Sequence, residues 1–232
     1  MPGLRRSQKL ELDGPAGKLE ALLEAPQDTE VVGCAVVCHP HPLHGGTMQN
    51  KVAHTLARSF IRQGFIALRF NFRGVNESDG EFDEGRGELE DVFAAMDWLS
   101  DNYPDLPLWN AGFSFGAAIA VRASVVRRPA GLISIAPAIS RFTKSLSSQP
   151  ECPWLILQGG QDELVAVDQT VAWVNELDPG PELQILEGAE HFFHGKLTLL
   201  REAVEAFIAR HTQEPVGRSS FGQRGGFNLS KH

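Results

Sequence analysis

The sequence is poor in cysteine, which excludes a disulfide framework as the basis of its fold. Three cysteines occur in 232 residues, at Cys34, Cys38 and Cys152. An odd, sparse set without C-x-x-C spacing is typical of reduced thiols. We therefore expect a cytoplasmic protein.

Long apolar runs and an excess of positive charge are also missing. No uncharged stretch is long enough to cross a bilayer, and the two early arginines are not followed by the apolar segment of a secretory signal. The formal net charge of −8 argues against a phosphate-backbone partner. We expect no nucleic-acid partner and no membrane span. The remaining composition, with 42% hydrophobic and 22% charged residues, is ordinary for a soluble globular domain.

Extended and helical patterns alternate along most of the chain. The first two extended segments, at 7–14 and 17–25, are separated by the turn "DGPAG" and predict a hairpin. Strands are then expected at 31–38, 65–72, 107–114, 131–138, 153–160 and 182–189, and helices at 51–63, 88–102, 115–126, 167–177 and 197–210. This order predicts one α/β domain over residues 1–212, with a mostly parallel twisted sheet and helices on both faces. The Gly- and Ser-rich segment 213–232 lacks periodicity, so we expect a flexible C-terminal tail.

The most informative motif is Gly112-Phe113-Ser114-Phe115-Gly116, which fits G-x-S-x-G between a predicted strand and a predicted helix. A serine at the apex of so tight a turn has a strained backbone, and close neighbouring segments require glycine at the flanking positions. The turn would lift the Ser114 hydroxyl above the sheet, at a helix N-terminus. Small residues could instead serve only close helix packing, but the strand–turn–helix context favours a nucleophile.

With this motif in this context, the chain resembles the α/β-hydrolase superfamily, and more narrowly the small lidless esterases related to dienelactone hydrolases. The resemblance covers about residues 19–211. It implies an α/β-hydrolase fold without a cap domain, because only a short connection joins the strands where related lipases insert caps. It also implies a triad in the chain order serine, acid, histidine. Dienelactone hydrolases typically carry a cysteine nucleophile, and Ser114 stands there instead.

Asp162 is the candidate acid of this triad. It directly follows an apolar predicted strand, so its carboxylate can reach over the carboxyl edge of the sheet, where open α/β sheets place their sites. The similar superfamily loop, G-x-x-D, agrees. Glu163 and Asp168 are rivals, although helix capping or the helix dipole explains Asp168.

His191 is the candidate base. The superfamily often has G-x-x-H-x-F after the last strand, and residues 188–193 match this pattern. His194 is the alternative. In the triad that the resemblance implies, Ser114 attacks the substrate, His191 transfers the proton, and Asp162 orients the imidazole.

The histidine loop, residues 37–50 with the sequence "VCHPHPLHGGTMQN", is expected to complete an oxyanion hole. One donor would be the N–H of Phe115, the residue after the nucleophile. Pro40 and Pro42 have no N–H, which leaves His41 or Leu43 as the second donor. Related enzymes that carry His-Gly-x here favour His41.

The same loop also suggests a metal site, because His39, His41 and His44 lie close together in the sequence. However, no cysteine or carboxylate stands at ligand spacing, and the prolines stiffen the loop. We therefore expect no metal and no cofactor. We expect the side chains of His39 and His44 to hydrogen-bond and position the loop instead.

The substrate is expected to be a small carboxylic ester or thioester, bound in an open site. Arg141 could attract an anionic group, and aromatic side chains could form an apolar acyl surface: Phe142 and Phe192, with Phe113, Phe115 and Phe193. Phe113 and Phe115 could equally belong to the core. Several alternatives remain open: a catalytically silent binding or scaffold protein, a peptidase, or a dienelactone-type hydrolase. The sequence does not decide between a monomer and a homodimer.

Overall fold

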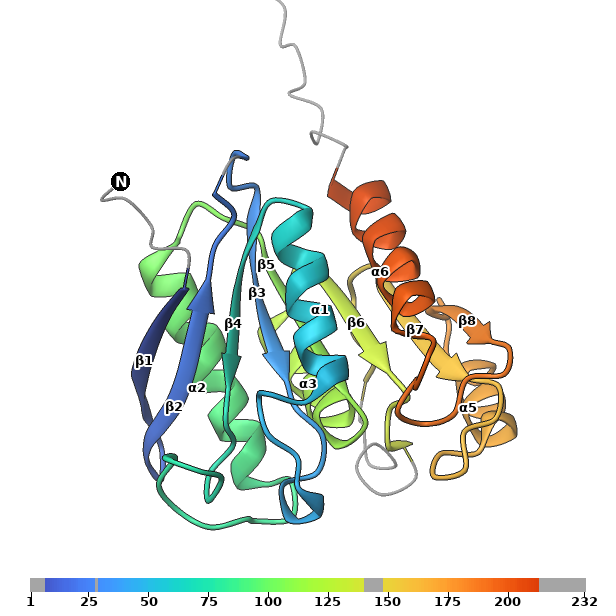
Figure 1. Ribbon diagram of the computed structural model, residues 1–232, viewed down its shortest axis with the longest axis horizontal. Coiled ribbons are helices and arrows are strands. Elements are labelled where there is room, and N and C mark those ends of the chain that lie inside the picture. Colours follow the sequence, from blue (N-terminus) through green and yellow to red (C-terminus); the bar gives the residue numbers. More distant parts are fainter. Residues whose placement is uncertain (1–6, 28, 140–147, 213–232) are drawn as a thin grey trace, which may run out of the picture.

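The computed structural model describes residues 7–27, 29–139 and 148–212. An eight-stranded sheet has the order β1-β2-β4-β3-β5-β6-β7-β8 (Figure 1). The strands are β1 (Ser7–Gly14), β2 (Gly17–Glu24), β3 (Gly33–Cys38), β4 (Phe65–Phe70), β5 (Leu108–Phe113), β6 (Gly131–Ile135), β7 (Trp154–Gly159) and β8 (Glu182–Leu186). The predicted opening hairpin is present, because β1 and β2 pair in antiparallel register.

Helices cover both faces of this sheet, as the β–α alternation predicts. The helices are α1 (Lys51–Arg62), α2 (Gly87–Asn102), α3 (Phe115–Arg127), α5 (Val167–Val174) and α6 (Leu197–Thr212), with a short 3-10 helix η1 (Pro42–His44). Side chains of α1 and α6 share one hydrophobic core with the sheet, and those of α2, α3 and α5 share the other (Figure 1). The five central strands are buried along nearly their whole length, as expected of strands covered on both sides.

The direction of the strands determines where side chains can meet. Strand β2 runs antiparallel to β4, whereas each neighbouring pair from β4 to β8 is parallel. The segments that follow β3, β5, β7 and β8 therefore leave from the same edge of the sheet, which lies at the bottom of Figure 1. The histidine loop and the candidate triad residues all follow these strand ends.

The element boundaries differ from the prediction by a few residues. The largest helix difference is in α5, which was expected to reach residue 177 and ends at Val174. Two turn hydrogen bonds, Glu176 N–H to Trp173 O at 3.1 Å and Leu177 N–H to Val174 O at 3.1 Å, continue the chain without an α-helical pattern. Pro179 follows closely, and the residue before a proline is disfavoured in the helical region. Several strands also end earlier than their apolar runs suggested, because the last apolar residues belong to the loops of the site.

The predicted tail at 213–232 and much of the connection between β6 and β7 lie outside the described residues. In the part of the chain that is described, no helix has both the length and the apolar character needed to cross a membrane. All three cysteines carry free thiols, and Cys34 and Cys38 are buried.

Candidate active site

Ser114 stands at the apex of the turn between β5 and α3. Its backbone has φ 53° and ψ −115°, a left-handed conformation that is strained for a residue with a side chain. Neighbouring segments hold it there: its N–H donates to Ile135 O at 2.8 Å, and its carbonyl accepts from the N–H groups of Ala118 and Ala138 at 3.1 Å. Strain that is held by three backbone hydrogen bonds is characteristic of a functional position.

The glycines on either side of Ser114 are required by close backbone approach. A Cβ atom at Gly112 would collide with the backbone of Gly116, and a Cβ atom at Gly116 would collide with the carbonyl groups of Cys38 and His39. The start of the histidine loop therefore passes directly against the first turn of α3. This contact brings the loop after β3 beside the candidate nucleophile.

The structure brings Ser114, His191 and Asp162 together in one row. His191 Nε2 lies 3.0 Å from Ser114 Oγ, and His191 Nδ1 lies 2.8 Å from Asp162 Oδ2. Both the imidazole and the carboxylate are almost wholly buried. The three residues come from the loops that follow β5, β7 and β8, so the parallel strands assemble the row from distant parts of the chain.

The environment of Asp162 favours its ionised form. Burial alone would raise its pKa, but the hydrogen bond from His191 and the N–H groups of Val165 and Leu164, at 2.7 and 2.9 Å from Oδ1, outweigh this effect and lower the pKa. A carboxylate can only accept hydrogen bonds, so Nδ1 of His191 carries the proton. Nε2 then presents its lone pair to the hydroxyl of Ser114.

The rival residues have other partners. Glu163 Oε2 lies 3.4 Å from the backbone N of His191 and makes no hydrogen bond to its ring. Asp168 lies in the first turn of α5 and accepts the N–H of Gln169 at 2.9 Å; the N-cap is Ala166, without a side-chain cap bond, so the helix dipole and not capping explains Asp168. His194 is exposed and pairs with Glu190 at 2.6 Å.

Gln158 is a buried partner of Asp162 that was not among the predicted residues. It lies in β7, has no exposed surface, and donates from Nε2 to Asp162 Oδ2 at 2.8 Å. The signal that could have revealed it is a lone polar residue in an otherwise apolar strand, "WLILQG". A glutamine at such a position needs buried partners.

His39 is a structural residue of the histidine loop, as expected. It is fully buried, accepts the N–H of Phe72 at Nε2 (3.0 Å), and donates from Nδ1 to Pro40 O (2.6 Å). Burial lowers its pKa to about 4, although the bond to Pro40 acts in the opposite direction. Both ring nitrogens of the neutral imidazole are thus engaged within the fold.

The other two histidines of the loop stack on each other. The rings of His41 and His44 lie 4.4 Å apart, and the His41 ring lies 5.1 Å from that of Phe115. For His44, the structure shows ring stacking in place of the expected side-chain hydrogen bond. The N–H of Leu43 donates to His41 Nδ1 at 3.3 Å, so this N–H has a partner within the loop. Across residues 7–27, 29–139 and 148–212, no three His, Cys, Asp or Glu side chains are grouped as a metal site would need.

The predicted substrate-contacting residues divide into three groups. Phe192 is 39% exposed, and its ring lies edge-on to His191 at 5.1 Å between ring centres. Phe193, in contrast, is fully buried, so its assignment to an acyl surface is wrong: it packs in the core beneath α6. Phe113 and Phe115 are buried as well. Arg141 and Phe142 lie outside the described residues.

A groove of about 320 Å³ opens beside Phe192, between the start of α1 and the loop after β8. It is lined by Thr47, Gln49, Asn50, Lys51, Val52, Phe192, His194 and Leu197. Thr47 belongs to the histidine loop, and Phe192 follows His191. The groove therefore runs between two of the loops that build the site.

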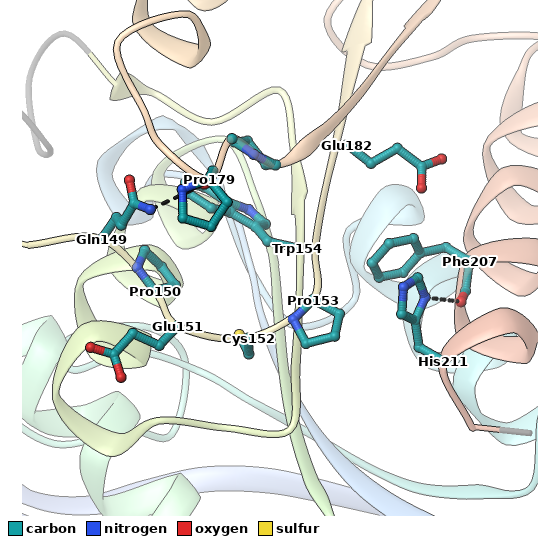
Figure 2. Close-up of a pocket in the computed structure, with 12 residues that line it drawn as sticks. Gln149, Pro150, Glu151, Cys152, Pro153, Trp154, Pro179, Glu182, Phe207 and His211 are labelled. Carbon is teal, nitrogen blue, oxygen red and sulfur yellow. Dashed lines mark hydrogen bonds between the residues drawn. The ribbon is translucent and has the colours of Figure 1, made fainter. Parts of the chain in front are cut away.

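A larger cavity, of about 520 Å³, lies at the amino-terminal ends of strands β7 and β8 (Figure 2). Its lining includes Trp154 and Glu182, the first residues of β7 and β8, together with Phe207 and His211 of α6. Asp162 and His191 follow the other ends of the same two strands. The cavity and the candidate active site thus lie at opposite ends of strands β7 and β8.

Comparison with known proteins shows close relatives over nearly the whole chain. Residues 41–150 match a family model described as serine aminopeptidase, S33. A lidless α/β serine hydrolase from Xanthomonas campestris, XC6422, is 39% identical, with a TM-score of 0.87 over 92% of this chain and 98% of that one. An α/β serine hydrolase homologue from Coxiella burnetii is 42% identical, with a TM-score of 0.83 over 88% of this chain and 98% of that one. The uncharacterized protein RP471 of Rickettsia prowazekii is 36% identical in an alignment of 207 residues that covers 84% of this chain and 86% of that protein.

Proposed function

The chain belongs to the α/β-hydrolase superfamily, and from this premise we propose that it hydrolyses small carboxylic esters or thioesters through an acyl-enzyme on Ser114. The observation that carries the proposal is the row of contacts from Ser114 Oγ through the His191 ring to Asp162. A serine hydroxyl is a weak nucleophile unless a base removes its proton, and this row supplies the base and the group that orients it.

Acylation follows from this geometry. His191 Nε2 accepts the proton of Ser114 as Oγ bonds to the substrate carbonyl carbon, and Asp162 stabilises the imidazolium that forms. The same nitrogen then donates the proton to the departing alkoxide or thiolate as the bond to the leaving group breaks. Water, deprotonated by His191, attacks the acyl carbon; the bond to Ser114 Oγ then breaks as His191 returns the proton to Oγ, and the acid is released.

Two backbone N–H groups are proposed to stabilise the tetrahedral oxyanion, those of Phe115 and His41. Phe115 begins α3, where the helix dipole favours negative charge. The contact of Gly116 with the carbonyls of Cys38 and His39 supports His41, because it brings the histidine loop against this helix end. Leu43 is the alternative second donor, and its N–H donates to His41 Nδ1 within the loop.

The surroundings of the row support an ester with an apolar portion. Leu43, Leu164 and Phe192 are 67%, 64% and 39% exposed, and they lie on three different loops of the site. We propose that these side chains contact the apolar part of the substrate. The groove beside Phe192 is proposed to hold the part of the substrate that does not react.

The proposal is tested with p-nitrophenyl esters of increasing acyl length. The wild-type protein should turn over short esters, and Ser114→Ala should lose activity by roughly four orders of magnitude or more while keeping its circular dichroism spectrum. Equal turnover by Ser114→Ala and wild type would refute the assignment of the nucleophile.

A peptidase is the second candidate, because the matching family model is described as a serine aminopeptidase. The same Ser114, His191 and Asp162 would serve amide hydrolysis. Amino-acid p-nitroanilides distinguish the two functions: an esterase leaves them intact at enzyme concentrations that consume the matching esters. A catalytically silent scaffold would cleave neither class of substrate.

A further inference from the structure

Gln158 occupies a fully buried position in which all of its amide groups have partners. Nε2 donates to Asp162 Oδ2 at 2.8 Å and to Val165 O at 3.1 Å, while Oε1 accepts the hydroxyl of Thr170 at 3.3 Å. Thr170, in α5, is also fully buried. The opposite amide orientation would place an oxygen against two acceptors, so the network defines which atom is the donor.

We propose that Gln158 and Thr170 are positioning residues that extend the row of Ser114, His191 and Asp162 into helix α5; this inference rests on the proposed function. Thr170 orients the amide of Gln158, and Gln158 in turn holds the carboxylate of Asp162. The row then joins side chains from β7, α5 and the loops after β5, β7 and β8.

The contacts of Asp162 show what Gln158 adds. Oδ1 accepts the N–H groups of Leu164 and Val165, and Oδ2 is shared between Nδ1 of His191 and Nε2 of Gln158. Without the amide, Oδ2 would have one donor instead of two, and the carboxylate that faces the imidazole would be held less firmly. The second bond of Nε2, to Val165 O, also ties the loop that carries Asp162 back to β7.

Glutamine suits this position because it offers two N–H groups and one acceptor. A glutamate carboxylate would face the Asp162 carboxylate and the Val165 carbonyl with no proton to donate. A methionine has nearly the same length and bulk but makes no comparable hydrogen bonds. Gln158→Met therefore removes the bonds while largely preserving the packing.

The pH response depends on the charged groups around His191. They include Asp162 and Glu163 on the loop after β7, and the Glu190–His194 pair on the loop of His191 itself. The variants below leave all four unchanged. Removing the Gln158 donor leaves more negative charge on Oδ2 facing the imidazole, which favours the imidazolium form.

Steady-state kinetics of Gln158→Met give the first test. We expect kcat to fall roughly tenfold with KM nearly unchanged, because outer hydrogen-bond partners of catalytic groups typically have effects of this size. We also expect the acid limb of the kcat/KM profile to move to higher pH, because His191 must be neutral to accept the proton. A merely structural glutamine would not move this limb.

Matched variants distinguish a positioning role of Gln158 from a general effect of replacing a glutamine. Gln184→Met makes the same change on the neighbouring strand β8, where the amide donates to Glu182 and not to a residue of the site, and should leave kcat and the acid limb unchanged. Thr170→Val removes the hydroxyl that donates to Gln158. It should change kcat and the acid limb in the same direction as Gln158→Met, but by less. Thr170→Ser retains the hydroxyl and should restore the wild-type profile.

Proton NMR gives a readout that does not need turnover. The low-field resonance of the His191 Nδ1–H, which reports its bond to Asp162, should move or broaden in Gln158→Met and stay in place in Gln184→Met. Wild-type kcat and an unmoved resonance in a folded Gln158→Met would overturn the inference. Failure of the wild type to hydrolyse any ester would overturn the proposed function instead.

Discussion

At the residue scale, His39 illustrates how burial decides what a histidine does. Its ring is neutral, fully buried and hydrogen-bonded at both nitrogens, and its pKa of about 4 lies below the usual 6.5. As the pH falls from about 6.5 to about 4, the unfolded chain binds a proton at this site before the folded protein does. His39 therefore stabilises the fold fully above pH 6.5, and this contribution is lost progressively down to pH 4.

This difference predicts a pH-dependent stability. Urea unfolding of the wild type should show a free energy of unfolding that falls by up to about 3 kcal/mol between pH 6.5 and pH 4 through His39 alone. His39→Gln, which retains an amide donor and acceptor, should be less stable at pH 7 and show a shallower dependence over this range. Identical slopes in the two proteins would contradict the assignment of a buried neutral ring.

His41 leads to a different prediction, because its proposed contribution is a backbone N–H. His41→Ala retains that N–H but loses the contacts of the ring with His44 and Phe115. We expect activity to stay within about tenfold of wild type, whereas loss of one oxyanion donor costs roughly a hundredfold or more. Kinetics with and without EDTA check this, and the chelator should have no effect. A loss of a thousandfold in His41→Ala would contradict a role limited to the backbone N–H, and inhibition of the wild type by EDTA would contradict a reaction without a metal.

The local sequence pattern predicts the role of some of these residues and not of others. Ser114 was predictable because a five-residue motif and its context specify its steric role. Gln158 is marked only as a lone polar residue in an apolar strand; its role was not predictable, because its partners Asp162, Val165 and Thr170 meet it only after β7, the following loop and α5 have packed. Phe193 was misassigned for a related reason: adjacent aromatic residues look alike in sequence, and only the loop conformation decides that Phe192 is exposed and Phe193 buried.

At the scale of elements, the site depends on the contact between the histidine loop and the first turn of α3. Gly116→Ala would place a methyl group against the carbonyls of Cys38 and His39, at the point where the loop approaches Ser114. We expect a loss of roughly 2 kcal/mol or more in stability and a fall in kcat, because backbone at this contact has to move. Thermal unfolding and ester kinetics measure the two effects.

Gly180→Ala is the matched control for that substitution. A Cβ atom at Gly180 would meet only ordinary contacts, the nearest being Leu177 O at 3.4 Å. This variant should keep wild-type stability within about 0.5 kcal/mol and wild-type kcat. If Gly116→Ala behaved in the same way, the close contact would not be essential to the site.

The order and type of the elements were predictable from periodicity, because strands covered on both faces form apolar runs and each helix carries an apolar stripe. The ends were less predictable, since an apolar run continues into loops that pack in the core. The end of α5 illustrates this: Leu177 fits the helical stripe, but the chain has already left the helix at Val174.

At the scale of the whole molecule, the groove beside Phe192 and the larger cavity have different surroundings. The groove beside Phe192 adjoins the loops of the candidate active site, while the cavity of Figure 2 lies at the opposite ends of β7 and β8. Gln149→Trp, which adds bulk at that cavity, should leave kcat/KM within about twofold of wild type, because the cavity lies at the ends of β7 and β8 opposite to Asp162 and His191. A large loss of activity in this variant would show that the two ends are coupled.

The most direct test of the central claim is covalent labelling of Ser114. Wild-type protein, Ser114→Ala and His191→Ala are treated with a fluorophosphonate, and the adduct is located by peptide mass spectrometry. A serine activated by the His191–Asp162 pair should be labelled rapidly and at Ser114 alone, with no adduct in Ser114→Ala and greatly slowed labelling in His191→Ala. Absence of an adduct on wild-type Ser114, or equal labelling in His191→Ala, would contradict an activated nucleophile at this position.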